Sequence, residues 1–233
     1  MPGFPKDALV QKAKGAFKCP KTLPAGVTQQ MCLDYLVGVS GAITEAVGIW
    51  KVTASLTEVK INACIASGGK VQGPGMEHLI STRAPRNTPW SINLSNAVSR
   101  GIHNCWKDWE RSLSVPNLPW YPVFAAYPGA NTPPVPNIPS PLAAMRQSLD
   151  CFKPSTLLTQ MKAKLNGSPA AGPEILAALA EGVSTAFFVW IPTQMITEVI
   201  GQGTAPLIWG FGSSVLPSQV VDGRAQGVAP FKT

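Results

Sequence analysis

The chain has 233 residues, a net charge of +7, 45% apolar residues and 13% charged residues. The charged fraction is about half the ~25% usual for a soluble globular domain, which excludes disorder driven by high charge. It also argues against a freely soluble enzyme of ordinary composition, because a surface so poor in charge exposes apolar patches that mark contacts with other proteins. The length allows one or two domains, and the composition favours a component of an assembly.

Most of the excess positive charge lies near the N-terminus. Five lysines in the first 21 residues face a single acidic residue, Asp7. We expect residues 1–30 to form a basic arm, either a solvated tail or a segment that neutralises phosphates or an acidic partner surface. Phe17 is the only aromatic residue among these lysines, so no specific nucleic-acid binding is expected. No secretory signal is expected either, because no continuous apolar stretch follows a basic start.

Three segments share a Val-Ser pair, a small residue two positions after the serine, and then an aliphatic or aromatic residue. They cover residues 39–43, 98–102 and 183–187, and at least one tryptophan follows each of them: Trp50, Trp106, Trp109 and Trp190. Apolar residues recur around each segment at steps of three and four, which predicts three helices that meet in one core. The small residues predict close approach of another backbone. The alternative is chance resemblance among helices rich in small residues.

The first two of these helices belong to a predicted helical part over residues 31–115, and a different kind of segment follows. Residues 116–141 contain nine prolines and no charged residue. Proline fixes φ and removes an N–H donor, so an extended strap is expected here in place of a helix or a central strand. Aromatic side chains in the strap predict that it lies along a protein surface, because a free tether is normally polar. They are Trp120, Tyr121, Phe124 and Tyr127.

Residues 142–233 are expected to form a second helical part. Short helices are predicted over 141–152 and 155–165, and the third repeated helix begins at Pro173. An extended C-terminal arm follows, in which Val215, Leu216, Val220 and Val221 suit a short strand. Glycines beside Trp209 and Phe211 suit sharp turns. The predicted fold is therefore mainly α, with a compact body of pseudo-repeated helices, a long Pro-rich extended strap and extended termini.

The chemistry of catalysis is poorly represented, so we expect no enzyme, no catalytic residue, no metal site and no cofactor. There are two histidines, and His103 lies two residues from Cys105, which places the two side chains on different faces of a helix. Asp108 and Glu110 diverge for the same reason. No dinucleotide loop, phosphate-binding loop or Gly-x-Ser-x-Gly motif occurs. The tryptophans suit core or interface anchors, and sugar binding is the alternative.

The five cysteines have no C-x-x-C spacing, and their odd number forbids complete internal pairing. Reduced, buried thiols are the default expectation. The alternative is a set of disulfides between subunits of a particle that meets oxidant after assembly, formed by Cys19, Cys32, Cys64, Cys105 and Cys151. The uncharged runs 182–197 and 199–221 are broken by proline or glycine, so we interpret them as buried protein and expect no membrane span.

One stretch of the sequence resembles a known family. The run WYPVFAAYPG at 120–129, followed by PPVPNIP at 133–139 and PLAA at 141–144, is similar to a segment of small structural proteins of tailed-bacteriophage virions. The helix 177–190 and the GQGTAP run at 201–206 resemble the second part of those proteins, so the likeness covers residues 94–210. It implies a structural subunit of the tail, neck or baseplate, located in the virion and assembled in the host cytoplasm.

The resemblance also implies partners, namely other virion proteins and copies of the same chain. The expected assembly contacts are the aromatic residues of the strap and of the C-terminal arm: Trp120, Tyr121, Phe124, Tyr127, Trp209 and Phe211. Two other functions remain as alternatives. One is an envelope-associated or pore-forming protein, and the other is a carbohydrate-binding module with its site at Trp106, Trp109 and His103.

Overall fold

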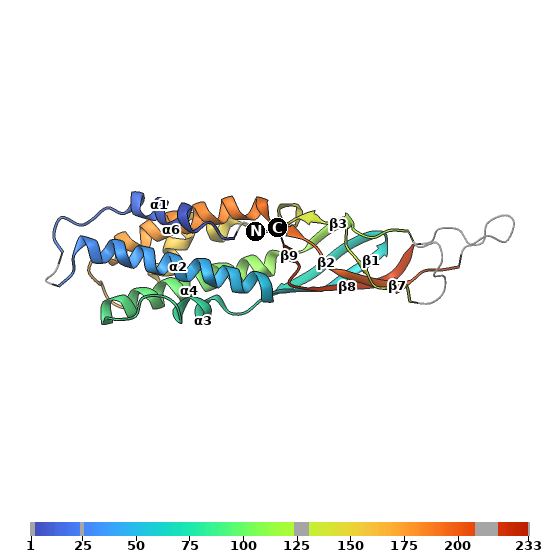
Figure 1. Ribbon diagram of the computed structural model, residues 1–233, viewed down its shortest axis with the longest axis horizontal. Helices are drawn as coiled ribbons and strands as arrows, with labels where there is room; N and C mark the ends of the chain where they lie inside the picture. The colour runs from blue at the N-terminus through green and yellow to red at the C-terminus, as the bar shows by residue number, and fades with distance from the viewer. Residues whose placement is uncertain (1–2, 24–25, 124–130, 208–218, 233) are drawn as a thin grey trace. The chain divides into compact units, whose positions relative to one another are not determined.

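The computed structural model describes residues 3–23, 26–123, 131–207 and 219–232 (Figure 1). The chain forms two compact units, which are described separately. The helical unit contains residues 1–50, 74–109 and 148–192, and the sheet unit contains residues 51–73, 110–147 and 193–233. About 49% of the chain is helical and 22% is in strands. The prediction of a mainly α fold is therefore wrong, because segments expected to be a strap or extended arms pair with other strands in a six-stranded and a three-stranded sheet.

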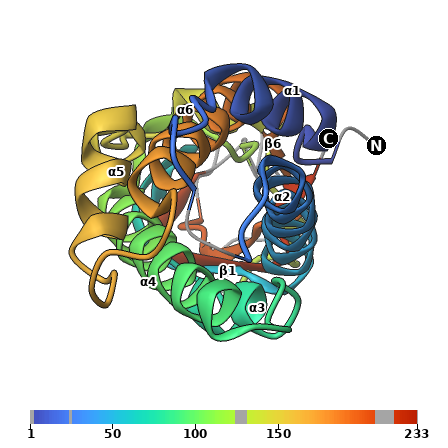
Figure 2. The ribbon, with the colours of Figure 1, turned by 90° about the vertical axis from the view of Figure 1, so that its left-hand side faces the viewer.

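Helices α2, α4 and α6 contain the three repeated segments, as the apolar spacing predicts. Their apolar positions face inward, and short helices complete the unit. Figure 2 views the helices end-on, with α1 lying beside α6. The bounds are α1 Lys6–Ala16, α2 Gln29–Thr53, α3 Met76–Ser81, α4 Pro89–Ser112, the 3-10 turn η2 Asp150–Phe152, α5 Pro154–Lys162, α6 Gly172–Trp190 and the 3-10 turn η3 Ile191–Thr193.

An aromatic cluster fills the core of the helical unit. The centroids of Trp50 and Trp106 are 5.1 Å apart, and those of Trp106 and Trp109 are 5.0 Å apart. Phe152 stacks on Phe187 with the ring centroids 3.5 Å apart. Trp190 lies 6.0 Å from Trp106, so the tryptophans that follow the three repeated segments meet in one core, as expected. Edge-to-face and stacked pairs of this kind add to the free energy of burial.

The N-terminal segment is not a solvated tail along its whole length. Residues Lys6–Ala16 form α1, whose Leu9 and Ala13 are completely buried against α6. The backbone of α1 approaches α6 at Gly182, where an added Cβ would lie 2.8 Å from the carbonyl oxygen of Leu9. Burial of one face of α1 therefore fixes this helix to the unit, and its lysines lie on the remaining faces.

The sheet unit is built on a six-stranded, curled antiparallel half-barrel with the strand order β3-β2-β1-β8-β7-β4. A second sheet has the order β5-β6-β9, and the 3-10 turn η1 covers Leu142–Ala144. The strands are β1 Ser55–Ala63, β2 Ile65–Gln72, β3 Val115–Pro119, β4 Val135–Pro136, β5 Ser140–Pro141, β6 Met195–Ile196, β7 Ile200–Thr204, β8 Val220–Val228 and β9 Phe231–Lys232.

Backbone irregularities explain why the β1–β2 hairpin was missed. Leu56, Val59 and Ile61 all face the buried side of the sheet, although they are not separated by a constant step of two. A register shift between Leu56 and Val59 accommodates the extra residue, and Glu58 has a positive φ of 57° there. Such a bulge breaks the alternation by which a strand is recognised.

The Pro-rich segment is extended in its described parts, as expected, and supplies strands β3 and β4. Both lie at edges of the sheet, where proline is tolerated because no ladder donor is lost. Asn137 fastens the segment to the sheet unit: its Nδ2 donates to the Ile196 carbonyl at 3.0 Å, and its Oδ1 accepts from the Val199 N–H at 2.9 Å. The expected helix over 141–152 is wrong, because η1 and η2 are single turns separated by residues 145–149, which are not helical.

Candidate functional site

The two carboxylates considered for catalysis, Asp108 and Glu110, have different hydrogen-bond partners. Glu110 is buried and accepts a hydrogen bond from the Gly73 N–H at 3.1 Å. Asp108 is exposed and accepts from the Cys151 thiol at 3.9 Å. Within the described ranges, no three residues of the types His, Cys, Asp and Glu lie close enough together to hold a metal ion.

The two tryptophans of the carbohydrate-binding alternative are not accessible to a sugar. Trp106 and Trp109 are buried to 1% and 0% exposure in the aromatic cluster. A sugar ring must stack on an exposed aromatic face, so this pair cannot serve as the surface that the carbohydrate-binding alternative requires.

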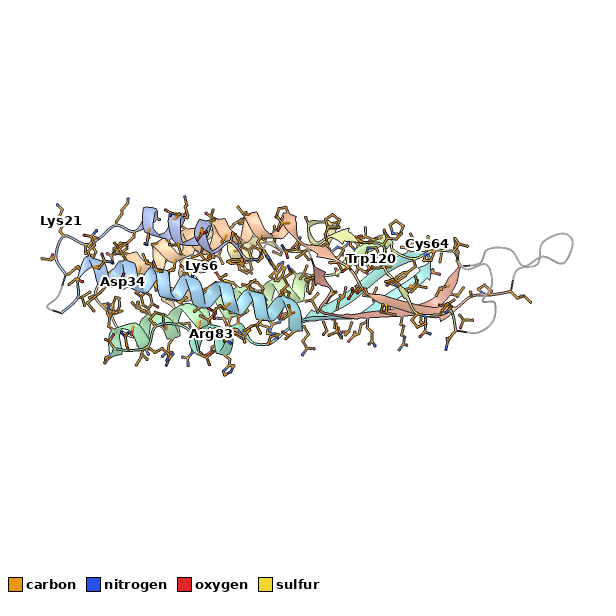
Figure 3. All side chains as sticks on the ribbon, in the orientation of Figure 1. Lys6, Lys21, Asp34, Cys64, Arg83 and Trp120 are labelled. Carbon is orange, nitrogen blue, oxygen red and sulfur yellow. The ribbon has the colours of Figure 1, made fainter. Side chains whose placement is uncertain are left out.

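The cysteines differ in accessibility. All five are free thiols, and Cys32 and Cys105 are buried within the helical unit. Burial, followed by the charges of Cys151 and Asp108, raises the pKa of Cys105 to about 12. These two thiols are therefore not positioned to cross-link neighbouring subunits. The others, Cys19, Cys64 and Cys151, are partly exposed, and Figure 3 shows Cys64 between β1 and β2.

Alkylation of the native protein with iodoacetamide near pH 8 is expected to modify Cys64 at least about tenfold faster than Cys105. The reagent has little access to Cys105, and its raised pKa leaves almost no thiolate, which is the reactive form. Mass spectrometry of the tryptic peptides gives the two rates, and the same reaction in denaturant is the control. Equal rates in the native protein would contradict the placement of Cys105 in the core.

The clearest candidate site is the outward face of the half-barrel sheet. Along β8, Gly223, Ala225 and Gly227 point to the buried side, and the residues between them are exposed. β7 shows the same alternation, with buried glycines at 201 and 203. An added Cβ on Gly203 would meet Gly223 Cα at 2.6 Å. Close packing on the inner side thus fixes which side chains of β7 and β8 point outward.

The strand register brings two basic residues together at the centre of this face. Lys60 on β1 stands opposite Arg224 on β8, and Arg224 stands opposite Gln202 on β7. Both cations are exposed. Among the residues that the structure describes, neither one forms an ion pair. The nearby Glu58 instead pairs with Lys70 at 2.7 Å.

A groove of about 480 Å³ runs beside this pair, on the sheet unit. Its base lies on β8, and its walls come from β1, β7 and the segment before β4. The groove is lined by a guanidinium, two side-chain amides, a carboxylate, a hydroxyl and three apolar residues, so it suits an extended polar chain better than a compact apolar ligand. The residues that line it are Thr57, Glu58, Pro134, Ile200, Gln202, Arg224, Ala225 and Gln226.

Exposed aliphatic side chains lie on the same strands. Ile200 is 39% exposed, Val221 is 46% exposed and Val228 is 76% exposed. Ile200 stands opposite Gln226, two residues along the strands from the row that contains Arg224, and Val228 stands opposite Ser55. Covering exposed branched aliphatic side chains with a partner removes apolar surface from water, which lowers the free energy of association. This geometry is typical of a contact surface.

No family model, curated protein or solved structure matches the chain. Its function is therefore inferred from the geometry of this surface and from the resemblance carried by the sequence.

The aromatic residues predicted as assembly contacts are only partly covered by the structure. Trp120 is buried, and its Nε1 donates to Ser140 Oγ at 2.8 Å (Figure 3). Tyr121 is also buried and donates its hydroxyl proton to the Val199 carbonyl at 3.0 Å. These two residues hold the strap inside its own unit, so they offer little surface to a neighbour. The remaining four, Phe124, Tyr127, Trp209 and Phe211, lie outside the described residues.

Two helical stretches are long and apolar enough to cross a membrane by length and composition. They are Gln29–Thr53 and Gly172–Thr193, and 50% and 67% of their most apolar windows are buried inside the structure. Their buried faces carry part of the aromatic cluster, as core helices do. They therefore give only weak support to a membrane role.

Proposed function

We propose that the chain is a structural subunit of a viral particle and acts through protein–protein contacts made by the outward face of its sheet. The observation that carries the proposal is this face, where exposed aliphatic groups, two unpaired cations and a groove lie together. The sequence resemblance to virion structural proteins of tailed bacteriophages supports the kind of particle. The proposal assigns no chemical reaction to the chain.

The edges of the sheet support a contact through its face. β3 forms one edge and contains Pro116 and Pro119, which lack N–H donors. At the other edge, β4 has two residues. The N–H of Thr132 donates to the Gly203 carbonyl at 2.8 Å, so the chain before β4 also pairs with β7. Prolines and short edge strands prevent the addition of a strand from another chain. A partner therefore has the outward face available and not a free edge.

Replacing Ile200 and Val228 by serine is expected to weaken the association of the chain with its particle by about tenfold or more. The two changes remove aliphatic area that a partner covers, and each buried methylene contributes about 0.8 kcal/mol. The measurement is the amount of chain in purified particles, determined by quantitative mass spectrometry. The control is Val189→Ser, because Val189 is 51% exposed on α6 of the helical unit. Equal incorporation of the double variant and the control would contradict the role of the sheet face.

A second candidate, an envelope-associated or pore-forming protein, is favoured by the length and hydropathy of α2 and α6. Insertion of these helices into lipid requires Trp50 and Trp190 to leave the aromatic cluster. Flotation with liposomes separates the two candidates: the assembly proposal expects the protein in the dense fraction, and co-flotation with the lipid would favour the membrane candidate.

A further inference from the structure

The position of Lys60 opposite Arg224 destabilises the sheet by repulsion between like charges, and the fold does not require two cations there. Residues directly opposite on antiparallel strands have Cβ atoms about 5 Å apart, and like charges at that spacing destabilise the pair. Their neighbours in the same row do not offset the charge, since Ser67 stands on one side and Gln202 on the other. A polar uncharged residue at either position would remove the repulsion.

Neither of the nearby acidic side chains pairs with these cations. Asp222 lies two residues from Arg224 on β8 and forms no ion pair with the described residues, and Glu58 is engaged elsewhere. Glu58 lies two residues from Lys60 on β1, but its carboxylate contacts Lys70 Nζ at 2.7 and 2.9 Å. Lys70 stands opposite Thr57, in a different row of the sheet. The two central cations are thus left available to an anion from outside the chain.

From these observations we propose that an acidic, extended segment of another protein docks across Lys60 and Arg224 and continues along the groove on β8. This inference rests on the proposed function and names the chemistry of the partner. Carboxylates of the segment pair with the ammonium and the guanidinium. Arg224 offers a planar fork of donors that matches a carboxylate.

The rest of the groove suits a peptide. Gln202 donates from Nε2 to the Thr132 carbonyl at 2.9 Å, which fixes its amide plane at the wall. Gln226 stands opposite Ile200, so an amide and an aliphatic group lie side by side in the groove. The backbone of a bound peptide forms hydrogen bonds with such amides, and the aliphatic side chains of the peptide pack against Ile200 and Pro134. Among the described residues that line the groove, none is an aromatic on which a nucleic-acid base could stack.

The partner is a different chain and not a second copy of this one. The chain carries a net charge of +7, and both cations at the centre of this face are exposed. Two copies therefore repel each other at this surface, and an acidic partner is attracted to it.

Fluorescence anisotropy with a labelled deca-glutamate peptide tests the proposal on the full chain. Replacing both Lys60 and Arg224 by serine is expected to reduce the affinity by about tenfold or more, since two charge-assisted contacts are lost. The control variant changes Lys162 and Lys164 to serine, which removes the same charge from exposed positions of the helical unit. Its affinity is expected to fall less than about twofold. Equal losses in the two variants would overturn the proposal.

A second readout guards against a folding defect. The melting temperature of the Lys60→Ser, Arg224→Ser variant is expected to equal or exceed that of the parent at low salt, because repulsion is removed. A ten-residue oligothymidylate is the competing probe. If it binds more tightly than deca-glutamate and depends on the same two residues, the partner is a nucleic acid and the proposal is overturned.

The peptide experiment and the particle experiment separate the two levels of the account. Suppose that the Lys60→Ser, Arg224→Ser variant loses peptide binding and that purified particles do not contain the chain. This result would refute the proposed function and support the acidic ligand. Presence of the chain in particles at unchanged amounts, with Lys60 and Arg224 both replaced, would refute the acidic partner and keep the structural role.

Discussion

Replacing Phe187 by alanine is expected to lower the free energy of unfolding by about 3–5 kcal/mol, the usual cost of emptying a core aromatic site. Phe187 is completely buried, stacks on Phe152, and lies 5.4 Å from Trp109 between ring centroids. The cavity would open within the aromatic cluster, beside the rigid rings of Phe152, Trp106 and Trp109, which limit collapse. Denaturant unfolding followed by tryptophan fluorescence measures the change.

The matched control is the adjacent residue. Phe188 is 42% exposed, so Phe188→Ala is expected to cost less than about 1 kcal/mol, as exposed substitutions do. Similar losses for the two variants would contradict the inward direction of Phe187 and the placement of the cluster.

The same geometry predicts that Trp109→Ala unfolds the unit and does not selectively abolish sugar binding.

Replacing Gly101 by alanine is expected to destabilise the protein by about 1–3 kcal/mol, the range seen for overpacked cores. An added Cβ would lie 2.7 Å from both Cα and N of Met161, which are backbone atoms of α5. Backbone cannot rotate away as a side chain can, so α5 must shift. Thermal unfolding by circular dichroism measures the loss.

Gly48→Ala provides the control, because both changes are glycine to alanine inside a helix. No atom lies within 4 Å of the Cβ added at Gly48, which is exposed on α2. Alanine is favoured over glycine in a helix by about 0.5–1 kcal/mol, so this variant is expected to be more stable than the parent. A stabilising effect of Gly101→Ala would show that α4 and α5 are not in close contact there.

The helical unit could be predicted from the sequence because its signals are local. The three-and-four spacing of apolar residues gives α2, α4 and α6, and the small residue of the second repeat, Gly101, lies where another backbone approaches, as predicted. The helix expected over 155–165 is α5, but its role as the partner at Gly101 could not be predicted, because that contact joins segments far apart in the chain.

Apart from the strand expected at Val220 and Val221, which begin β8, the sheet unit could not be predicted, for three physical reasons. Bulges at Glu58 and Asp222 break the alternation of β1 and β8, and strands such as β4 and β5 have only two residues. The inward positions of β7 and β8 are largely glycine, which has no hydrophobic signal. One clue was present: small residues at 223, 225 and 227 alternate with Arg224, Gln226 and Val228.

The candidate surface depends on register and was missed as a consequence. Lys60 and Arg224 are ordinary surface residues in the sequence, and only the antiparallel pairing of β1 with β8 brings them side by side. Two aromatic residues of the strap, Trp120 and Tyr121, have the opposite role, because both are buried in the sheet unit. Prominence in a sequence does not distinguish a buried anchor from a contact residue.

Lysine acetylation of purified particles tests the outward face most directly. Lys60 and Lys164 are both exposed in the isolated chain, and their labelling is compared by mass spectrometry between the free chain and the particle. The account predicts that acetylation of Lys60 falls in the particle. Acetylation of Lys164, on the helical unit, is expected to fall less, so that the ratio of Lys164 to Lys60 labelling rises relative to the free chain. Equal labelling of Lys60 in both states, or particles that lack the chain altogether, would contradict it.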